Sequence, residues 1–221
     1  MTTEVDVCNL ALSHIRAETI NSLNEASVAA IQCKILFPIL RDQMLMESCW
    51  TFNRKLEPLA VLPLVDIFNW NIAYQYPTDC LRITRLILNF EEINESHTTY
   101  RYRYGTLYDD YYQPNLRRKV EYEVFNVSGN RVIAANECEL RIDYSARMTD
   151  TSLWTAQFIL AFSHLLAAEL AIPIAGVEKG RSLRSDSLGL YNKYFTEAQQ
   201  HDINQRYTLP ADSELISIRR Y

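Results

Sequence analysis

The sequence predicts an α+β protein, in which a helical bundle built from both chain ends carries an inserted antiparallel β-sandwich-like domain. Two observations predict it: apolar residues recur at helical spacing near both ends, and the middle of the chain is rich in aromatic and β-branched residues. The expected divisions are residues 1–49 and 150–206 for the bundle, 50–149 for the β-rich domain and 207–221 for an extended C-terminal tail.

The first part of the chain predicts two helices. Residues 4–16 and 25–48 carry apolar residues near the helical period, and the second run presents one broad apolar face. The residues of this face are Ala26, Ala29, Ala30, Cys33, Leu36, Phe37, Leu40, Met44 and Leu45. The candidate caps of the second helix are Ser22 with Glu25, at capping-box spacing, and Asn24. Pro38 removes a backbone donor inside the run and is expected to kink the helix or to split it.

The middle of the chain predicts several short strands. The strand candidates are RITRLILNF, TYRYRYGTLY, KVEYEVF, NRVIAAN and ELRIDYS. The turn signal NVSGNR at 126–131 separates two of them and predicts a hairpin. Short strands at this spacing favour an antiparallel sandwich or a small barrel.

The last part of the chain predicts two more helices, 153–172 and 181–206, separated by PIAGVEKG. The first of them is apolar almost all round, so a central position is expected, whereas the second is amphipathic. The candidate caps of the first are Asp150, Thr151 and Ser152. We interpret it as a core helix and not as a membrane span, because polar residues interrupt it. These residues are Gln157, Ser163, His164 and Glu169.

Composition excludes several classes of function. The formal net charge of −5 has the opposite sign to that of most nucleic-acid-binding proteins. With only 5 glycines, the chain has no glycine-rich phosphate loop. The 5 cysteines are scattered and odd in number, which indicates reduced thiols. The first residues carry acids and no basic segment, so no signal peptide is expected.

The residues with reactive side chains favour structural interpretations. His164, with Glu169 further along the same run, is interpreted as a hydrogen-bonded core histidine in preference to a catalytic one. Cys80 is interpreted as a buried structural thiol, because no residue near it in sequence would lower its pKa. The pairs Glu91-Glu92 and Asp109-Asp110 could act as metal ligands or as acid and base, but solvated loop charges are the preferred interpretation. We therefore expect no catalytic, cofactor-binding or metal-binding residue.

A segment rich in tyrosine and arginine has three interpretations: one packed face of an amphipathic strand, a protein interface, or a surface that stacks single-stranded bases. Its residues are Tyr100, Arg101, Tyr102, Arg103, Tyr104, Tyr108, Tyr111 and Tyr112. The acidity of the chain counts against the third interpretation. As an interface, the segment would contact a tail nozzle or a tail fibre.

Four segments follow one another in a recognisable order. The first contains Ala30 and Cys33 on a helix, then Phe37-Pro38, Arg41-Asp42, Trp50 and Phe52. The second, WNIAYQYPTDCLRI, contains Tyr74, Tyr76-Pro77, Asp79-Cys80 and Leu81-Arg82. The third, LRIDYSARMTDTSLW, contains Asp150 and Trp154, and the fourth is FILAFSHLLAAELAIPIAG. Together they resemble the tail tubular protein A family, the head-to-tail adaptors of podoviruses, over roughly residues 5–206. Residues from about 89 to 137 match no motif of the family.

The resemblance implies a bundle with an inserted β domain, and a ring, usually of twelve subunits, docked under the phage portal. It also implies no catalytic residues and no cofactor. The expected partners are the portal protein ring, a tail nozzle protein similar to tail tubular protein B, further copies of the chain and, in some phages, tail fibres. Genome DNA would pass through without specific binding, and no membrane would take part. The expected location is the head–tail junction of the virion, after assembly in the host cytoplasm.

We expect the C-terminal tail to become ordered on assembly, against the portal or a neighbouring subunit. Its expected interface residues are Tyr207, Leu209, Leu215, Ile216, Ile218, Arg219, Arg220 and Tyr221. Three alternatives remain open: a phage DNA-binding accessory protein, a hydrolase that uses His164 or Cys80, and the connector of a long-tailed phage. The first predicts strongly salt-dependent DNA binding, and the second predicts lost turnover when either residue is substituted.

Overall fold

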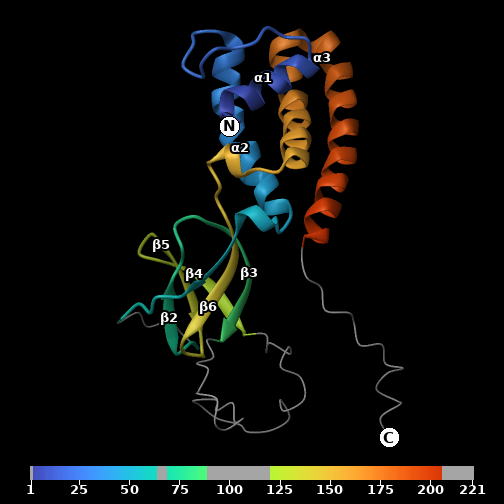
Figure 1. Cartoon of the computed structure of the whole chain (residues 1–221). Coiled ribbons are helices and arrows are strands. Elements are labelled where there is room, and N and C mark those ends of the chain that lie inside the picture. The colour runs from blue at the N-terminus through green and yellow to red at the C-terminus, as the bar shows by residue number, and fades with distance from the viewer. Residues whose placement is uncertain (1, 64–68, 89–119, 206–221) are drawn as a thin grey trace, which may run out of the picture. The chain divides into compact units, whose positions relative to one another are not determined.

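The computed structural model describes residues 2–63, 69–88 and 120–205. These residues form three α-helices and two antiparallel three-stranded sheets, so the α+β class is confirmed. The chain divides into two compact units (Figure 1). The helical unit comprises Met1–Met44, Trp50–Phe52 and Asp150–Tyr221, and the β unit comprises Leu45–Cys49 and Asn53–Thr149.

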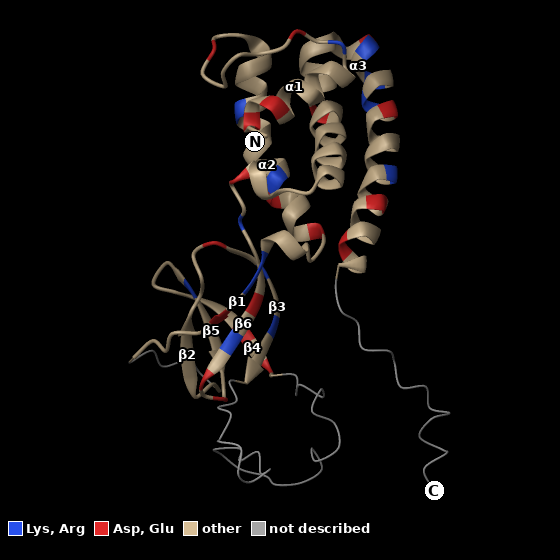
Figure 2. Ribbon diagram, in the orientation of Figure 1, with Lys and Arg blue, Asp and Glu red and all other residues tan. Residues whose placement is uncertain are grey.

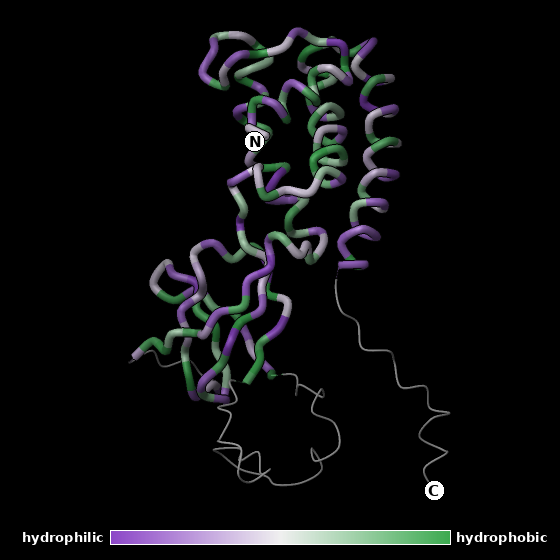
Figure 3. The backbone as a smooth tube through the Cα atoms, viewed as in Figure 1, coloured by the Kyte–Doolittle hydropathy of each residue, from purple (hydrophilic) through white to green (hydrophobic). Residues whose placement is uncertain are grey.

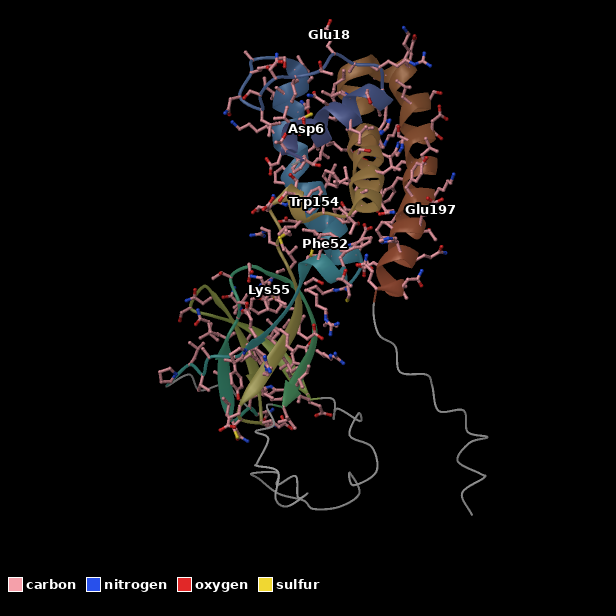
Figure 4. All side chains as sticks on the ribbon, in the orientation of Figure 1. Asp6, Glu18, Phe52, Lys55, Trp154 and Glu197 are labelled. Atoms are coloured by element: carbon pink, nitrogen blue, oxygen red, sulfur yellow. The ribbon has the colours of Figure 1, made fainter. Side chains whose placement is uncertain are left out.

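Helix α1 spans Glu4–His14 and begins at a capping box. The Thr3 side chain accepts a hydrogen bond from the backbone N–H of Asp6, and the Asp6 carboxylate accepts one from the backbone N–H of Thr3. Asp6 is labelled in Figure 4. This reciprocal pair satisfies two backbone donors that a helix N-terminus otherwise leaves without partners.

Helix α2 spans Val28–Glu47 and continues through Pro38, so the expectation of a split helix is wrong. Its cap is Ser27, whose Oγ accepts a hydrogen bond from the backbone N–H of Ala30 at 3.2 Å. The expected caps lie one turn too early. Ser22 and Glu25 do interact, but Glu25 Oε1 accepts from the Ser22 backbone N–H in the turn that precedes the helix.

Helix α3 spans Ala156–Asn204 and is capped by Thr155, not by the expected Asp150, Thr151 or Ser152. Asp150 instead caps the short 3-10 turn Thr151–Leu153 that precedes the helix. At Gly176 the backbone leaves helical geometry, with φ 78° and ψ 170°, which glycine tolerates. The break divides α3 into a first arm, residues 156–175, and a second arm, residues 177–204, which run in opposite directions (Figure 1).

The two arms differ in character. The first is mostly hydrophobic, whereas hydrophobic and hydrophilic residues alternate along the second (Figure 3). The segment PIAGVEKG, which was expected to separate two helices, is mostly helical. Only Gly176 leaves helical geometry, and Pro173 stays within the helix. Hydrogen bonds connect the end of the second arm to Thr51. The backbone N–H and the Oγ1 of Thr51 each donate a hydrogen bond of 2.7 Å to the Asp202 carboxylate.

The β unit contains two sheets. Sheet A has the order β1-β6-β3 and sheet B the order β2-β5-β4. The strands are β1 Arg54–Pro58, β2 Ile72–Gln75, β3 Cys80–Leu88, β4 Tyr122–Val127, β5 Asn130–Ala135 and β6 Leu140–Ala146. Strands β4 and β5 form the expected hairpin, in which Val127 pairs with Asn130. Ser128 and Gly129 have φ values of 51° and 84°, as the two-residue turn of a tight hairpin requires.

One group of buried residues belongs to both sheets. Tyr74 and Ile133 come from sheet B, and Leu86, Ile142 and Tyr144 come from sheet A. All five are members of the same hydrophobic cluster and are at most 3% exposed. Alternate residues of β6, from Leu140 to Ala146, therefore face this cluster, and the residues between them lie on the other face of sheet A.

Candidate assembly surfaces

His164 is buried, as a core histidine should be. Its ring stacks on that of His14 with centroids 3.9 Å apart, and on that of Tyr194 at 5.2 Å. Its Nδ1 has no hydrogen-bond partner among the described residues, so the expected hydrogen bond is not made by this atom. Burial and the nearby His14 lower the pKa of His164 to about 4. A neutral imidazole only 5% exposed is suited to packing more than to proton transfer with a substrate.

Ser163 contacts the second histidine of this stack. Its Oγ donates a hydrogen bond to the Leu160 carbonyl and lies 3.1 Å from His14 Nε2. A serine beside a histidine can be a nucleophile and its base, but a nucleophile must reach its substrate. Ser163 is completely buried, so the pair connects α1 to the first arm of α3 and does not form a nucleophilic site.

Cys80 is also buried, at 7% exposed. Burial raises the pKa of its thiol, and this effect outweighs a hydrogen bond from Tyr76, which lowers it. Because the thiolate is the reactive form, a raised pKa makes Cys80 a poor nucleophile. Among the described residues, no group of three histidine, cysteine, aspartate or glutamate side chains is arranged to hold a metal ion.

All of the expected contact residues lie outside the described part of the chain. The residues concerned are Tyr207, Leu209, Leu215, Ile216, Ile218, Arg219, Arg220 and Tyr221 in the tail, and Tyr100, Arg101, Tyr102, Arg103, Tyr104, Tyr108, Tyr111 and Tyr112 in the tyrosine-rich segment. Glu91-Glu92 and Asp109-Asp110 lie outside it as well. The expectations for these residues stay predictions.

Helix α2 carries a stripe of exposed aliphatic side chains on the face opposite the core. Val28 is 62% exposed, Ile31 46%, Ile35 53% and Ile39 60%. Successive residues rotate by roughly 100° about a helix axis, so these four lie along one line. They are four of the twelve large hydrophobic side chains exposed in the described chain. We call these four residues the α2 stripe.

The α2 stripe has the spacing of a helix-packing seam. Steps of three and four residues place side chains where a second helix packs against them. Burial of half of a Val or Ile side chain contributes about 1 kcal/mol, so covering the stripe would stabilise an assembly appreciably. Single exposed hydrophobic residues are common on soluble proteins, whereas an aligned set marks a contact surface.

The sequence contains a signal for this stripe, although only one apolar face was expected on this helix. The face expected to be buried is largely buried, with Ala30, Cys33, Phe37, Leu40 and Met44 in the core. The aliphatic residues that lie outside that face recur at helical spacing on the opposite side of the helix. A helix with two apolar faces indicates one face for the core and another for a partner.

The outer face of sheet A is rich in arginine. Strand pairing places Arg54, Arg82, Arg85 and Arg141 on the same face as Asp143. Asp143 is completely buried and accepts hydrogen bonds from Arg54 Nε at 2.7 Å and Arg85 Nε at 2.9 Å. Burial alone would raise the pKa of this carboxyl, but the two guanidinium groups outweigh burial and lower it. The face keeps an excess of positive charge on an acidic chain.

A shallow hollow of about 550 Å³ lies among strands β3, β4 and β5. Its lining includes Tyr76, Arg82, Tyr122, Phe125 and Arg131. The Arg131 guanidinium lies over the Tyr76 ring, 5.3 Å from its centroid, in a cation–π arrangement. The hollow is open, and none of its lining residues forms a pair of nucleophile and base.

Several of the aromatic residues on which the family resemblance depends pack together. Phe37 stacks on Trp154 with centroids 6.0 Å apart, and Trp50 stacks on Phe52 at 6.1 Å. Phe158 contacts Trp50, Phe52 and Trp154 at about 5 Å each. Figure 4 labels Phe52 and Trp154, which come from separate segments of the chain. Phe37, Trp50, Trp154 and Phe158 are buried, so these residues build the core of the helical unit.

Helix α3 is long and apolar enough to cross a membrane by length and composition, with a mean hydropathy of 1.9 over its most apolar window. In that window, 61% of the residues are buried inside the protein, as in the core helix of a soluble fold. Charged residues are sparse on the first arm and frequent on the second (Figure 2).

Searches with the sequence matched no protein-family model and no curated protein.

Proposed function

We propose that the chain is a structural protein of the virion: the subunit of a head-to-tail adaptor ring in a short-tailed bacteriophage. The ring would connect the portal to the tail nozzle and form part of the DNA channel. The α2 stripe is the observation that carries the proposal, because it gives the helical unit a face suited to side-by-side packing. The resemblance to the adaptor family supplies the kind of assembly.

The positions of the motif residues support using the resemblance in this way. Phe37, Trp50 and Phe52 of the first matched segment share one aromatic core with Trp154 of the third. Motifs that matched by chance would have no reason to meet in space. The matched residues thus support the fold of the helical unit. The surfaces that would contact partners are argued from other residues of this chain.

We also propose the finer architecture, a helical bundle that carries a β-sandwich-like domain. Two observations support the sandwich: both sheets contribute to one hydrophobic cluster, and the second face of sheet A carries the polar residues of β3 and β6. Three helical segments support the bundle. Phe37 of α2 contacts Phe162 of the first arm, and His164 of the first arm stacks on Tyr194 of the second.

In this proposal the partners are the portal ring, further copies of the chain, a nozzle protein and, where present, tail fibres. Genome DNA would slide past without being held, since a net charge of −5 repels phosphate. The virion head–tail junction would be its location, and no enzymatic activity or cofactor is needed for such a role.

The arginine-rich outer face of sheet A favours one alternative, a DNA-binding accessory protein. Four arginines share that face with a single aspartate, and arginine is a residue that proteins use to contact phosphate. Such a protein would lose DNA affinity steeply as salt rises. The buried Asp143 neutralises part of the charge, which weakens this alternative.

The proposal is tested by co-sedimentation with the portal ring of the same phage. The wild-type chain should move to the portal fraction, whereas Ile35→Gln should move there less because it places an amide within the α2 stripe. Val124→Gln is the matched control, since Val124 is also exposed but belongs to the β unit. Wild-type protein that stays at the top of the gradient, with binding to duplex DNA that falls with salt, would replace the proposal with the alternative.

A further inference from the structure

The second arm of α3 has a flank that complements the α2 stripe. Leu183 and Leu190 lie on this flank at helical spacing, and Leu190 is 41% exposed. Asp186 and Lys193 occupy the same side and are exposed. Neither of these two charged residues forms an ion pair within the described part of the chain. We call these four residues the arm flank.

The α2 stripe and the arm flank belong to helices on opposite sides of the first arm. Phe37 of α2 contacts Phe162 of the first arm with ring centroids 5.1 Å apart. On its other side the first arm contacts the second, through the stack of His164 on Tyr194. Figure 1 shows the same order, with the first arm between α2 and the second arm.

Helix α2 and the second arm also run in the same direction. In Figure 1 both descend from the end of the unit that holds α1 and the Gly176 break. In a ring with one rotation axis, a face of each subunit contacts a different face of the next subunit. Rotation about an axis parallel to these helices leaves their directions unchanged, so only helices that already run the same way can meet in parallel.

A single parallel register matches both kinds of side chain. When Ile31 lies beside Leu183, Ile39 lies beside Leu190 to within one residue. The same register places Lys34 beside Asp186, and opposite charges facing one another specify an alignment. Lys34 is exposed, and its Nζ donates to Asn24 Oδ1 at 2.9 Å without pairing with a carboxylate among the described residues.

We infer that the α2 stripe of one subunit packs in parallel against the arm flank of a second copy of the chain, with Lys34 and Asp186 as an intersubunit pair. The inference rests on the proposed ring and names the two faces that close it. The contact is heterologous, so an incomplete ring keeps one free stripe at one end and one free flank at the other until it closes.

A charge exchange tests the pairing. Lys34→Glu and Asp186→Lys each place like charges at the contact, and each should weaken side-by-side assembly at least about tenfold. The double variant Lys34→Glu/Asp186→Lys restores opposite charges and should restore assembly. Arg181→Glu changes an exposed charge outside both faces and should leave assembly unchanged. Circular dichroism checks that each variant is folded, and mass photometry measures ring formation on the purified portal of the same phage.

A zero-length crosslink identifies the partner residue directly. Carbodiimide joins an amine to a carboxylate only where the two are in contact, so a mixture of light and ¹⁵N-labelled copies should yield a Lys34–Asp186 peptide pair of mixed isotope composition. A pair from one isotope alone would mean a contact within one chain and would overturn the inference.

The outcomes separate the inference from the function it rests on. If wild-type rings form on the portal and neither single variant weakens them, the pairing is wrong and the adaptor function stands. If the double variant stays as weak as the single variants, the pairing is likewise wrong. If the wild-type chain neither binds the portal nor assembles, the function and the inference fail together.

Discussion

The stacked histidines His14 and His164 differ in their chemistry from an exposed side chain. Their rings lie 3.9 Å apart and nearly parallel, which two neutral imidazoles tolerate and two imidazolium ions do not. Burial lowers the pKa of both, and the charge of His14 adds to the effect at His164. The pair connects α1 to the first arm of α3, and the Tyr194 stack extends the contact to the second arm.

We predict that the helical unit loses stability as the pH falls below the unfolded pKa of histidine. The folded pKa of His164 is about 4, against an ordinary value of 6.5, so the unfolded chain binds a proton first. Stability is full above pH 6.5 and falls as the pH decreases toward 4. Between pH 7 and pH 5, protonation linked to His164 should lower the free energy of unfolding by about 2 kcal/mol.

His164→Phe removes the titrating group and keeps a ring in the stack. Urea unfolding of both proteins at pH 7 and pH 5 measures the difference in their pH dependence. The variant should lose less stability than the wild type over this interval. Equal losses would show that the stack does not couple protonation to folding.

Asp143 is the residue whose loss should most destabilise the β unit. We predict that Asp143→Asn lowers the free energy of unfolding by about 1.5–3 kcal/mol, because it weakens the charge-assisted hydrogen bonds from Arg54 and Arg85 to a buried group. Asp79→Asn is the control, since the carboxylate of Asp79 is 33% exposed and pairs with an exposed Lys55. Its effect should be about 1 kcal/mol through that pair. Thermal unfolding followed by circular dichroism compares the two.

At the scale of single residues, the sequence predicted burial better than it predicted partners. His164 and Cys80 are buried, as expected. Their neighbours come from distant parts of the chain: His14 lies 149 positions before Ser163, with which it interacts. No local pattern relates such positions, so only the folded chain shows the histidine stack.

Among the secondary-structure elements, the α3 hairpin depends on two glycines with different roles. Gly176 adopts the positive φ at which the helix breaks. Gly180 lies in the second arm, where an added Cβ would come within 2.7 Å of the Ala171 carbonyl oxygen and of Ile172 Cα. The close approach of the two arms therefore requires glycine at 180.

We predict that Gly180→Ala destabilises the helical unit by about 1–3 kcal/mol, because backbone atoms of the first arm must move. Gly189→Ala is a matched control in the same arm, where an added Cβ meets nothing within 4 Å. Alanine forms helix more readily than glycine, so the control should stabilise the unit by about 0.5–1 kcal/mol. Opposite signs in chemical denaturation are the expected result, and two changes of equal sign would contradict close packing of the arms.

Most long elements were predictable, and their ends were not. The hairpin at 126–131 and strands β3, β4, β5 and β6 coincide with sequence runs that alternate or are β-branched. Strands β1 and β2 are short, and the RKLEP sequence of β1 has no strand pattern; pairing with β6 makes it a strand. The cap of α3 is Thr155 and not one of the expected residues, because several neighbouring residues of the sequence are equally good caps.

On the scale of the whole molecule, the proposed assembly depends on which surfaces of the chain are exposed. The net charge predicted an acidic protein, and the helical and β-branched patterns predicted the α+β class. The resemblance predicted an assembly role that stays a proposal. The α2 stripe was missed because a periodic pattern identifies an apolar face without showing which face the core uses. Such a distinction needs the tertiary structure, since both faces of α2 satisfy the helical period.

We predict that truncation after Arg206 abolishes portal binding and leaves the fold intact. The removed residues include the apolar and basic side chains expected to order on the portal or a neighbouring subunit. Circular dichroism should show an unchanged spectrum, while co-sedimentation with the portal should be lost. Equal binding by the truncated and full chains would exclude the tail from the contact.

The adaptor role is best tested by electron microscopy of the purified chain mixed with the portal ring of the same phage. We expect a second collar beneath the portal, with the rotational symmetry of the portal and one copy of the chain per repeat. A well-formed portal that remains bare at saturating concentrations of the chain would contradict the adaptor function.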